Sequence, residues 1–173
     1  MPETLSLEAL NRATLARQLL LTRHDLDVVA AVERLAGLQA QLAKPPFVGL
    51  WTRLAGFERA QLLDALHDRR IVRVTGMRCT LHLLSAADYL RLRGALVPVL
   101  DGAMTAISKA IATSRGGTLT DLPALVAAAR EALDHEALTF DAVRERLVAR
   151  FPGEDERAMG YAVRTQVPLV QVP

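Results

Sequence analysis

The sequence predicts a mainly α fold that carries small β-hairpins, and three observations support this prediction. Leucine, valine and alanine recur at helical spacing through the first 68 residues. The period then changes from 3.6 to 2 residues at about Arg70, which is typical of a hairpin. Helical spacing resumes after a glycine-containing break at 114–117. Helices followed by a hairpin are the element order of a winged helix, so we expect tandem winged-helix (helix-turn-helix) units.

The first of these units is expected to begin near the N-terminus. Asp27 is a residue type that caps helices, while Pro45 and Pro46 prevent the preceding segment from continuing as a helix. Alternating apolar and β-branched residues on both sides of Gly76 predict two paired strands. We therefore expect helices over 6–21, 27–38, 47–54 and 58–68, and hairpin strands at 71–75 and 79–84.

The second half of the chain predicts a further helical unit. A long connecting helix is expected over 86–112, kinked or divided at Pro98. The predicted linker at 114–117 gives two domains, 1–113 and 118–173. Helices are expected at 122–134, 139–150 and 154–165, and an apolar strand at 167–173. Because no partner strand follows it, we expect the second winged helix to be incomplete and the chain to be the N-terminal fragment of a longer protein.

Composition excludes several classes of protein. Hydrophobic residues make up 51% of the 173 residues and charged residues 23%, which is typical of a globular chain and not of a disordered one. One cysteine excludes a disulfide framework and a zinc site built from several thiolates. The four histidines lack metal-ligand spacing, so we expect no metal and no cofactor. We also expect no membrane segment, because no apolar run approaches about 20 residues, and with no secretion signal visible we expect a cytoplasmic location.

The distribution of charge points to an anionic partner. Arginine outnumbers lysine 19 to 2, and residues 1–115 carry a net +5 against −3 for residues 116–173. Segment 69–93 has one acid, Asp88, and six arginines: Arg69, Arg70, Arg73, Arg78, Arg91 and Arg93. The guanidinium fork suits phosphate. The alternative is a solvated face in a protein from an arginine-rich, GC-rich genome.

Two glutamines stand out because of their spacing. Gln39 and Gln41 would diverge by about 200° on a helix, whereas in an extended segment they would point to the same side. The double proline that follows makes a helix end or an extended stretch plausible here. The two amides could then line one cleft, and the alternative is a polar helix end with solvated glutamines.

Three ordered blocks of sequence carry a resemblance to a known family. They are Leu35-Ala36-Gly37-Leu38-Gln39-Ala40-Gln41, Gly49-Leu50-Trp51-Thr52-Arg53-Leu54 and Arg73-Val74-Thr75-Gly76-Met77-Arg78-Cys79-Thr80-Leu81-His82-Leu83. Together they resemble the bacterial winged-helix DNA glycosylases of the azinomycin-resistance type, whose hallmark is a Gln-x-Gln or Gln-x-Asp motif. The resemblance runs from about Asn11 to the C-terminus and departs from the family where Cys79 replaces an expected glycine.

The resemblance implies an enzyme of DNA repair. Its expected activity is monofunctional hydrolysis of the N-glycosidic bond of alkylated purines in double-stranded DNA, including the unhooking of interstrand crosslinks. Gln39 and Gln41 would be catalytic, in a bacterial cytoplasm at the nucleoid. The alternatives are a non-catalytic winged-helix DNA-binding protein or transcriptional regulator, and a helical interaction domain without a nucleic-acid partner. The sequence leaves the oligomeric state open.

Further residues are expected to contact DNA or to lie in the core. Strand alternation would place Arg78, Thr80 and His82 on one outward face, although His82 is equally compatible with a structural histidine. Trp51 is expected in the core rather than as a platform for bases, and Cys79 is expected to face the hydrophobic side and be inert. The expected DNA contacts are Lys44, Arg69, Arg70, Arg73, Arg78, Thr80 and His82.

Overall fold

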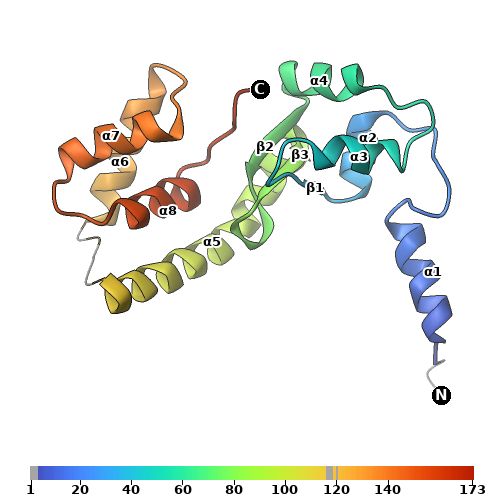
Figure 1. Ribbon diagram of the computed structural model, residues 1–173, viewed down its shortest axis with the longest axis horizontal. Coiled ribbons are helices and arrows are strands. Elements are labelled where there is room, and N and C mark those ends of the chain that lie inside the picture. Colours follow the sequence, from blue (N-terminus) through green and yellow to red (C-terminus); the bar gives the residue numbers. More distant parts are fainter. Residues whose placement is uncertain (1–3, 116–118, 120) are drawn as a thin grey trace. The chain divides into compact units, whose positions relative to one another are not determined.

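The computed structural model describes residues 4–115, 119 and 121–173 (Figure 1). These residues form a mainly helical structure with a small three-stranded sheet, which confirms the predicted fold class at this level. The chain up to Val74 clusters with Leu81–Leu90 in a first unit, and Thr75–Thr80 clusters with Arg91–Val172 in a second. The linker glycines at 116 and 117, and residue 118, lie outside the described residues. The predicted domain ranges stay a prediction.

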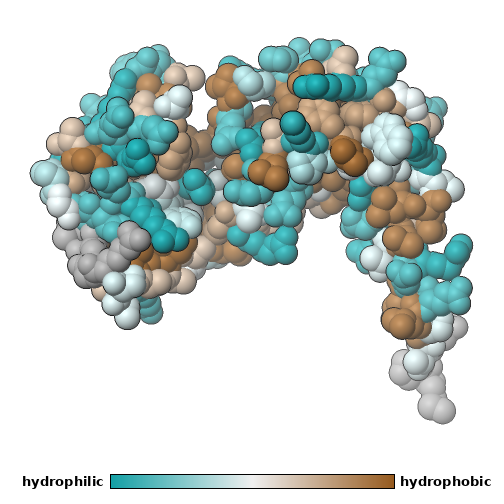
Figure 2. All heavy atoms as spheres, in the orientation of Figure 1, coloured by the Kyte–Doolittle hydropathy of each residue, from teal (hydrophilic) through white to brown (hydrophobic). Residues whose placement is uncertain are grey.

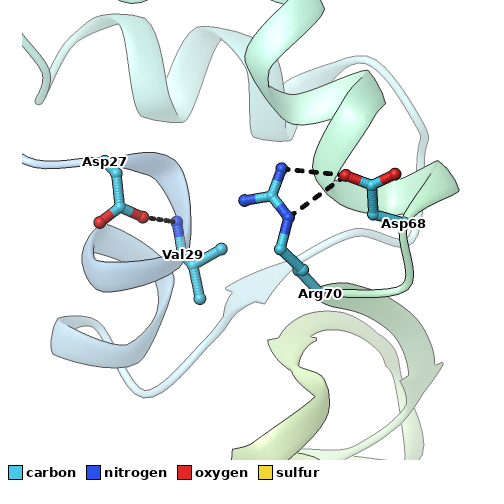
Figure 3. A network of polar contacts seen from close by, with 4 residues as sticks. All are labelled: Asp27, Val29, Asp68 and Arg70. Carbon is cyan, nitrogen blue, oxygen red and sulfur yellow. Dashed lines mark hydrogen bonds and ion pairs between the residues drawn. The ribbon is translucent and has the colours of Figure 1, made fainter.

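Capping residues and prolines mark where helices of the first unit begin. Asp27 precedes α2, and its Oδ1 accepts hydrogen bonds from the N–H groups of Val29 at 2.8 Å and Ala30 at 3.1 Å (Figure 3). Two prolines occupy the first positions of α3, so this helix begins earlier than predicted, because proline lacks an N–H that a first turn does not need. The helices are α1 (Leu7–Arg17), α2 (Val28–Arg34), α3 (Pro45–Trp51) and α4 (Arg59–His67).

The second helix ends four residues before its predicted end, and the cause is local. Ala36 and Gly37 have positive φ values of 53° and 103°, which stop the helix. A Cβ on Gly37 would lie 2.5 Å from Cδ2 of Leu84 and 3.0 Å from the carbonyl oxygen of Leu83. Only glycine combines this backbone with this close approach to a strand, and the segment that follows it carries both glutamines.

The sheet has the strand order β1-β3-β2. Strand β2 (Ile71–Thr75) has the predicted bounds, whereas β3 (Leu81–Ser85) begins two residues later than predicted. Strand β1 (Leu38–Gln39), which the sequence did not predict, pairs antiparallel with β3, so that Leu38 faces Leu83 and Gln39 faces His82. The β2–β3 connection is a 3₁₀ turn over Met77–Cys79, and this turn replaces the predicted start of the second strand.

The core of the first unit fastens the sheet to the helices. The fully buried side chains are aliphatic and come from the helices and all three strand segments: Val28, Ala31, Val32, Ala40, Leu50, Leu54, Leu62, Ala65, Ile71 and Leu83. A second buried cluster combines the strand residues Val72, Val74 and Leu84 with Tyr89. Because Ala40 and Leu83 belong to the main core, the glutamine segment rests on well-packed structure.

The turn over Met77–Cys79 carries two consecutive left-handed residues, Arg78 at φ 55° and Cys79 at φ 56°. This conformation costs a residue with a Cβ about 1–2 kcal/mol, and glycine avoids the cost. We expect the Cys79→Gly variant to be more stable than Cys79→Ala by about 1 kcal/mol. Urea unfolding of the two variants measures this difference, and equal midpoints would contradict it.

Helix α5 (Ala86–Arg115) is one continuous helix that contains Pro98. The sequence predicted a kink or a division at Pro98, and the helix is not divided there. Ser85 caps it, because its Oγ accepts a hydrogen bond from the N–H of Asp88 at 3.1 Å. Over Ala86–Ser114 this helix is long and apolar enough to cross a membrane by length and composition alone, with 17% of that window buried. One helix that meets this criterion is weak evidence for a membrane segment, because core helices of other proteins also meet it. The expected absence of a membrane segment stays a prediction.

Three capped helices complete the described part of the second unit. Asp121, Thr139 and Asp155 accept hydrogen bonds from N–H groups of the first turns of α6 (Leu122–Asp134), α7 (Phe140–Arg150) and α8 (Glu156–Gln166). These helices confirm the predicted ones within two residues. The predicted strand at 167–173 is wrong for residues 167–170, which have no strand assignment. Val167 and Leu169 pack against the α6–α8 core instead.

Helix α1 buries none of its residues. Its expected leucine stripe is exposed, with Leu7 84% and Leu10 47% accessible, and Figure 2 shows apolar side chains of this helix on the surface. Ser6 caps the helix, since its Oγ accepts a hydrogen bond from the N–H of Ala9 at 3.1 Å. The helix is therefore set by its cap and its local sequence rather than by packing.

Candidate active site and nucleic-acid interface

The two glutamines lie at the end of an edge strand. Gln39 is in β1 opposite His82, and its side chain is exposed. The ladder continues for one residue, because the Ala40 N–H donates to the carbonyl oxygen of Leu81 at 2.7 Å. The segment that carries the two glutamines is therefore extended, which is one of the two geometries that the sequence left open. The other geometry, a helix end, is excluded because α2 ends at Arg34.

Gln41 follows the strand, and its side-chain amide has a defined orientation. Its Oε1 accepts a hydrogen bond from the N–H of Leu81 at 3.1 Å. The Leu81 N–H is a donor, so it bonds to the amide oxygen of Gln41 and not to the Nε2 group, which is itself a donor. The Nε2 group therefore points away from Leu81. The side chain is nonetheless exposed, so its remaining hydrogen-bonding groups are accessible from solvent.

The chemistry available to two exposed carboxamides is limited and specific. Each offers a carbonyl acceptor and two N–H donors, and neither ionises in the physiological range. Such groups can orient a water molecule or stabilise a developing positive charge, but they cannot act as strong general bases. Among the described residues, no group of three or more His, Cys, Asp or Glu side chains could hold a metal ion.

The structure gives Arg73 a role that the sequence did not indicate. Its Nε donates to the carbonyl oxygen of Ala40 at 2.9 Å, and its Nη2 donates to that of Gln41 at 3.0 Å. The side chain is half-buried. Arg73 therefore holds the backbone of the glutamine segment, whereas the positive charge of segment 69–93 suggested a phosphate contact.

His82 is only 4% exposed, so it does not lie on the exposed strand face that alternation predicted. Strand β3 is the central strand of the sheet and is buried on both faces, since Leu83 belongs to the main core and Leu84 to the second cluster. The His82 side chain shares its side of the sheet with Gln39, because directly opposed residues of paired strands point the same way. Its structural interpretation, one of the two left open, agrees with this burial.

The other expected DNA contacts lie in loops and turns. Lys44, Arg69, Arg70 and Arg78 are exposed. Arg70 forms an ion pair with Asp68 at 3.4 Å (Figure 3), and because both side chains are at least half exposed this pair contributes little stability. Thr80 is half-buried, and its Oγ1 donates to the carbonyl oxygen of Met77 at 3.1 Å, which closes the turn.

Trp51 is exposed to 52%, so the expectation that it lies in the core is wrong. The guanidinium of Arg23 lies 4.2 Å from the centre of its ring. The buried face of α3 is formed by Pro46 and Leu50, and Trp51 falls on the other side with Val48. Counting the helix from Pro45 would have indicated this, but the predicted start at 47 hid it.

Cys79 is half-buried, and burial raises the pKa of its thiol above the ordinary value. A raised pKa lowers the thiolate fraction near neutral pH, and thiolate is the reactive form. This agrees with the expectation that Cys79 is inert. Two hollows are described in the second unit, lined by residues of α6, α7 and α8 and of the α7–α8 connection, and neither glutamine contributes to them.

Comparison with known proteins decides the family. The sequence profile of the family described as "DNA glycosylase AlkZ-like" matches residues 32–173, which include both glutamines and the whole sheet. The chain belongs to the AlkZ-like family. The resemblance seen in the three sequence blocks is thereby confirmed. No curated protein sequence matches the chain.

A solved AlkZ structure supports the same assignment. The chain is similar to the DNA glycosylase AlkZ of Streptomyces sahachiroi, with a TM-score of 0.73 and 26% sequence identity. The similarity covers 92% of this chain but 44% of the other chain. This AlkZ-like chain therefore spans less than half the length of the solved relative.

One more residue of the AlkZ-like blocks has a positioning role that the sequence did not reveal. Arg53 donates from Nε to the carbonyl oxygen of Gln18 and from Nη1 to that of Gly49, both at 2.8 Å. Burial lowers the pKa of its guanidinium from the ordinary value. Arg53 thus ties the residue after α1 to α3, which explains structurally why an arginine stands in the second block.

Proposed function

We propose that this chain carries the Gln-x-Gln motif of a monofunctional DNA glycosylase that removes alkylated purines from double-stranded DNA. Its substrates include purines that link the two strands in an interstrand crosslink. The helices and the β2–β3 hairpin of the first unit act as a winged helix on DNA, and the helices of the second unit act as part of a second one, in a bacterial cytoplasm. The observation that carries the proposal is the pair of exposed carboxamides at the end of β1, in a chain of the AlkZ-like family.

The chemistry of the substrate suits neutral side chains. A purine alkylated at N7 or N3 is cationic, so its glycosidic bond is already weakened. When that bond breaks, its electron pair goes to the purine, which leaves as a neutral base, and positive charge develops on the sugar. A water molecule then bonds to C1′ and loses a proton to solvent. No acid or strong base is needed for either step.

Each glutamine has a part in this reaction. The carbonyl oxygen of Gln39 accepts a hydrogen bond from the attacking water and faces the sugar cation, which lowers the barrier by positioning and by charge stabilisation. Gln41 acts through an amide that its hydrogen bond with the Leu81 N–H holds in place. That bond uses one lone pair of Oε1, so the second lone pair and the two Nε2 hydrogens remain available for the reaction. The motif itself contains no amine that could form a Schiff base, so no strand cleavage is expected.

The exposed arginines are expected to bind DNA through phosphates. Phosphate contacts release counterions, so duplex affinity falls with salt. We expect Arg78→Ala to reduce the slope of log affinity against log salt by about one unit and to weaken all sequences alike. Fluorescence anisotropy with two unrelated duplexes between low and moderate salt measures both effects. An unchanged slope would show that Arg78 contacts no phosphate and lies on a solvated surface.

Base release from duplex DNA tests the proposed function. The protein is incubated with a duplex that contains N7-methylguanine and, separately, with an unmodified duplex of the same sequence. Release of free N7-methylguanine without strand cleavage is expected, and the unmodified duplex should yield no free base. Binding of one preferred sequence without base release from any alkylated duplex would instead support the non-catalytic DNA-binding alternative.

A further inference from the structure

The guanidinium of Arg73 completes a hydrogen-bond ladder that the backbone leaves open. The pairing of Gln39 with His82 puts Ala40 opposite Leu81 in the antiparallel register. In such a pair the two residues normally exchange two N–H to O bonds. Only one of the two is formed, from the Ala40 N–H to the Leu81 oxygen at 2.7 Å.

Two side chains replace the missing bond. The Leu81 N–H donates to Oε1 of Gln41 at 3.1 Å. The carbonyl oxygen of Ala40, which this N–H would otherwise meet, accepts from Nε of Arg73 at 2.9 Å. Nη2 of the same guanidinium also binds the carbonyl oxygen of Gln41 at 3.0 Å. Arg73 and Leu81 therefore hold Gln41 at its backbone and at its side chain.

The position of Arg73 in the sheet explains why an arginine is needed. Arg73 is on β2, and β3 lies between β2 and the motif strand β1 in the sheet order. The side chain must be long enough to span that distance, and it must present two parallel donors to two successive carbonyl oxygens. A guanidinium fork does both, whereas the three donors of an ammonium group diverge from one nitrogen and cannot reproduce two parallel N–H groups.

We propose that Arg73 is a positioning residue that fixes the side-chain amide of Gln41 for base excision, rather than a phosphate contact. It acts by drawing the Ala40 oxygen away from Leu81, so that the Leu81 N–H is left for Gln41. The inference rests on the proposed function, in which Gln41 takes part in excision. It moves Arg73 out of the set of DNA contacts and into the support of the motif.

The conservative variant Arg73→Lys provides the test, with Arg34→Lys as the matched control, since Arg34 is an exposed arginine at the end of α2. At saturating alkylated duplex, Arg73→Lys should lower the single-turnover excision rate about 10- to 100-fold, because small misplacements of reacting groups have effects of that size. Duplex affinity and its salt slope should stay as in the unaltered protein. Because lysine keeps the positive charge, a phosphate contact is tested with the neutral variant Arg73→Gln. A salt slope reduced by about one unit in Arg73→Gln, or an unchanged excision rate in Arg73→Lys, would overturn the proposal.

A double-mutant cycle shows whether Arg73 acts through Gln41. In a Gln41→Ala background, Arg73→Lys should lower the excision rate no further, because the group it positions is gone. In a Gln18→Ala background, which removes an exposed glutamine outside the site, it should have its full effect. An equal loss in both backgrounds would overturn the proposal.

A readout independent of activity separates this inference from the proposed function. The side-chain amide signals of Gln41 provide this readout by NMR. In Arg73→Lys they should shift toward those of a solvated glutamine, because the Ala40 oxygen is released to Leu81 and the Leu81 N–H leaves Gln41, whereas in Arg34→Lys they should not shift. Unchanged Gln41 signals in Arg73→Lys would overturn the inference even if excision is observed. Shifted signals in a protein that releases no base would support the hydrogen-bond arrangement and refute the proposed function alone.

Discussion

Replacing Gln39 with alanine is expected to lower base excision by about 100-fold or more, the size of effect seen when one positioned polar group is lost from an active site. The reason is that the carbonyl oxygen of Gln39 is proposed to hold the attacking water and face the sugar cation. The fold should remain, because Gln39 is exposed and its backbone pairing with His82 is kept. Single-turnover release of N7-methylguanine at saturating protein measures the effect.

The Gln18→Ala variant is the control for this prediction. Gln18 is also exposed and also lies in the first unit, directly after α1. It should excise at the unaltered rate, and duplex affinity should be nearly the same in both variants. If Gln39→Ala excises normally, Gln39 is not a catalytic residue and the excision activity resides elsewhere in the protein.

Replacing Gly37 with alanine is expected to destabilise the first unit by about 2–4 kcal/mol, from the sum of backbone strain and overpacking. Its φ of 103° is outside the range that alanine adopts readily. The new Cβ would also lie 2.5 Å from Cδ2 of Leu84 and 3.0 Å from a strand carbonyl oxygen. Because Gly37 directly precedes β1, excision should fall together with stability. Urea unfolding followed by circular dichroism measures the stability change.

Gly56→Ala separates the two causes of this effect. Gly56 also has a positive φ, of 67°, but a Cβ there would meet nothing within 4 Å. It should lose only the backbone contribution, about 1 kcal/mol, and should keep its excision activity. Equal losses in the two variants would show that the approach of Leu83 and Leu84 to Gly37 costs nothing.

Local sequence signals were sufficient for most of the helices and for one strand. Asp27, Thr139 and Asp121 are strong caps next to periodic apolar residues, and the helices after them begin where predicted. Strand β2 has its predicted bounds because four of its five residues, Ile71, Val72, Val74 and Thr75, are β-branched. Strand β1 could not be predicted, since a two-residue strand has no periodicity and exists only through its pairing with β3.

The roles of Gln39 and Gln41 stay a prediction, but the geometry of their segment is now defined. The sequence left a helix end and an extended stretch open, and the structure has the extended one. The hydrogen bonds of Arg73 span more than 30 residues of sequence, and no local pattern announces such a contact. The burial of His82 follows from the place of β3 at the centre of the sheet, where Leu83 on one face and Leu84 on the other are both buried, and local alternation does not show that both faces are covered.

The two prolines at the start of α3 have a consequence for how DNA can be held beside the motif. Helix starts commonly attract phosphate with their unpaired N–H groups, but Pro45 and Pro46 have none, and the N–H of Phe47 already donates to the carbonyl oxygen of Lys44 at 3.1 Å. The peptide dipoles of this helix therefore offer a phosphate no directed donor. Attraction at this place depends on the ammonium group of Lys44, whose field is screened by dissolved ions within about 10 Å at moderate ionic strength.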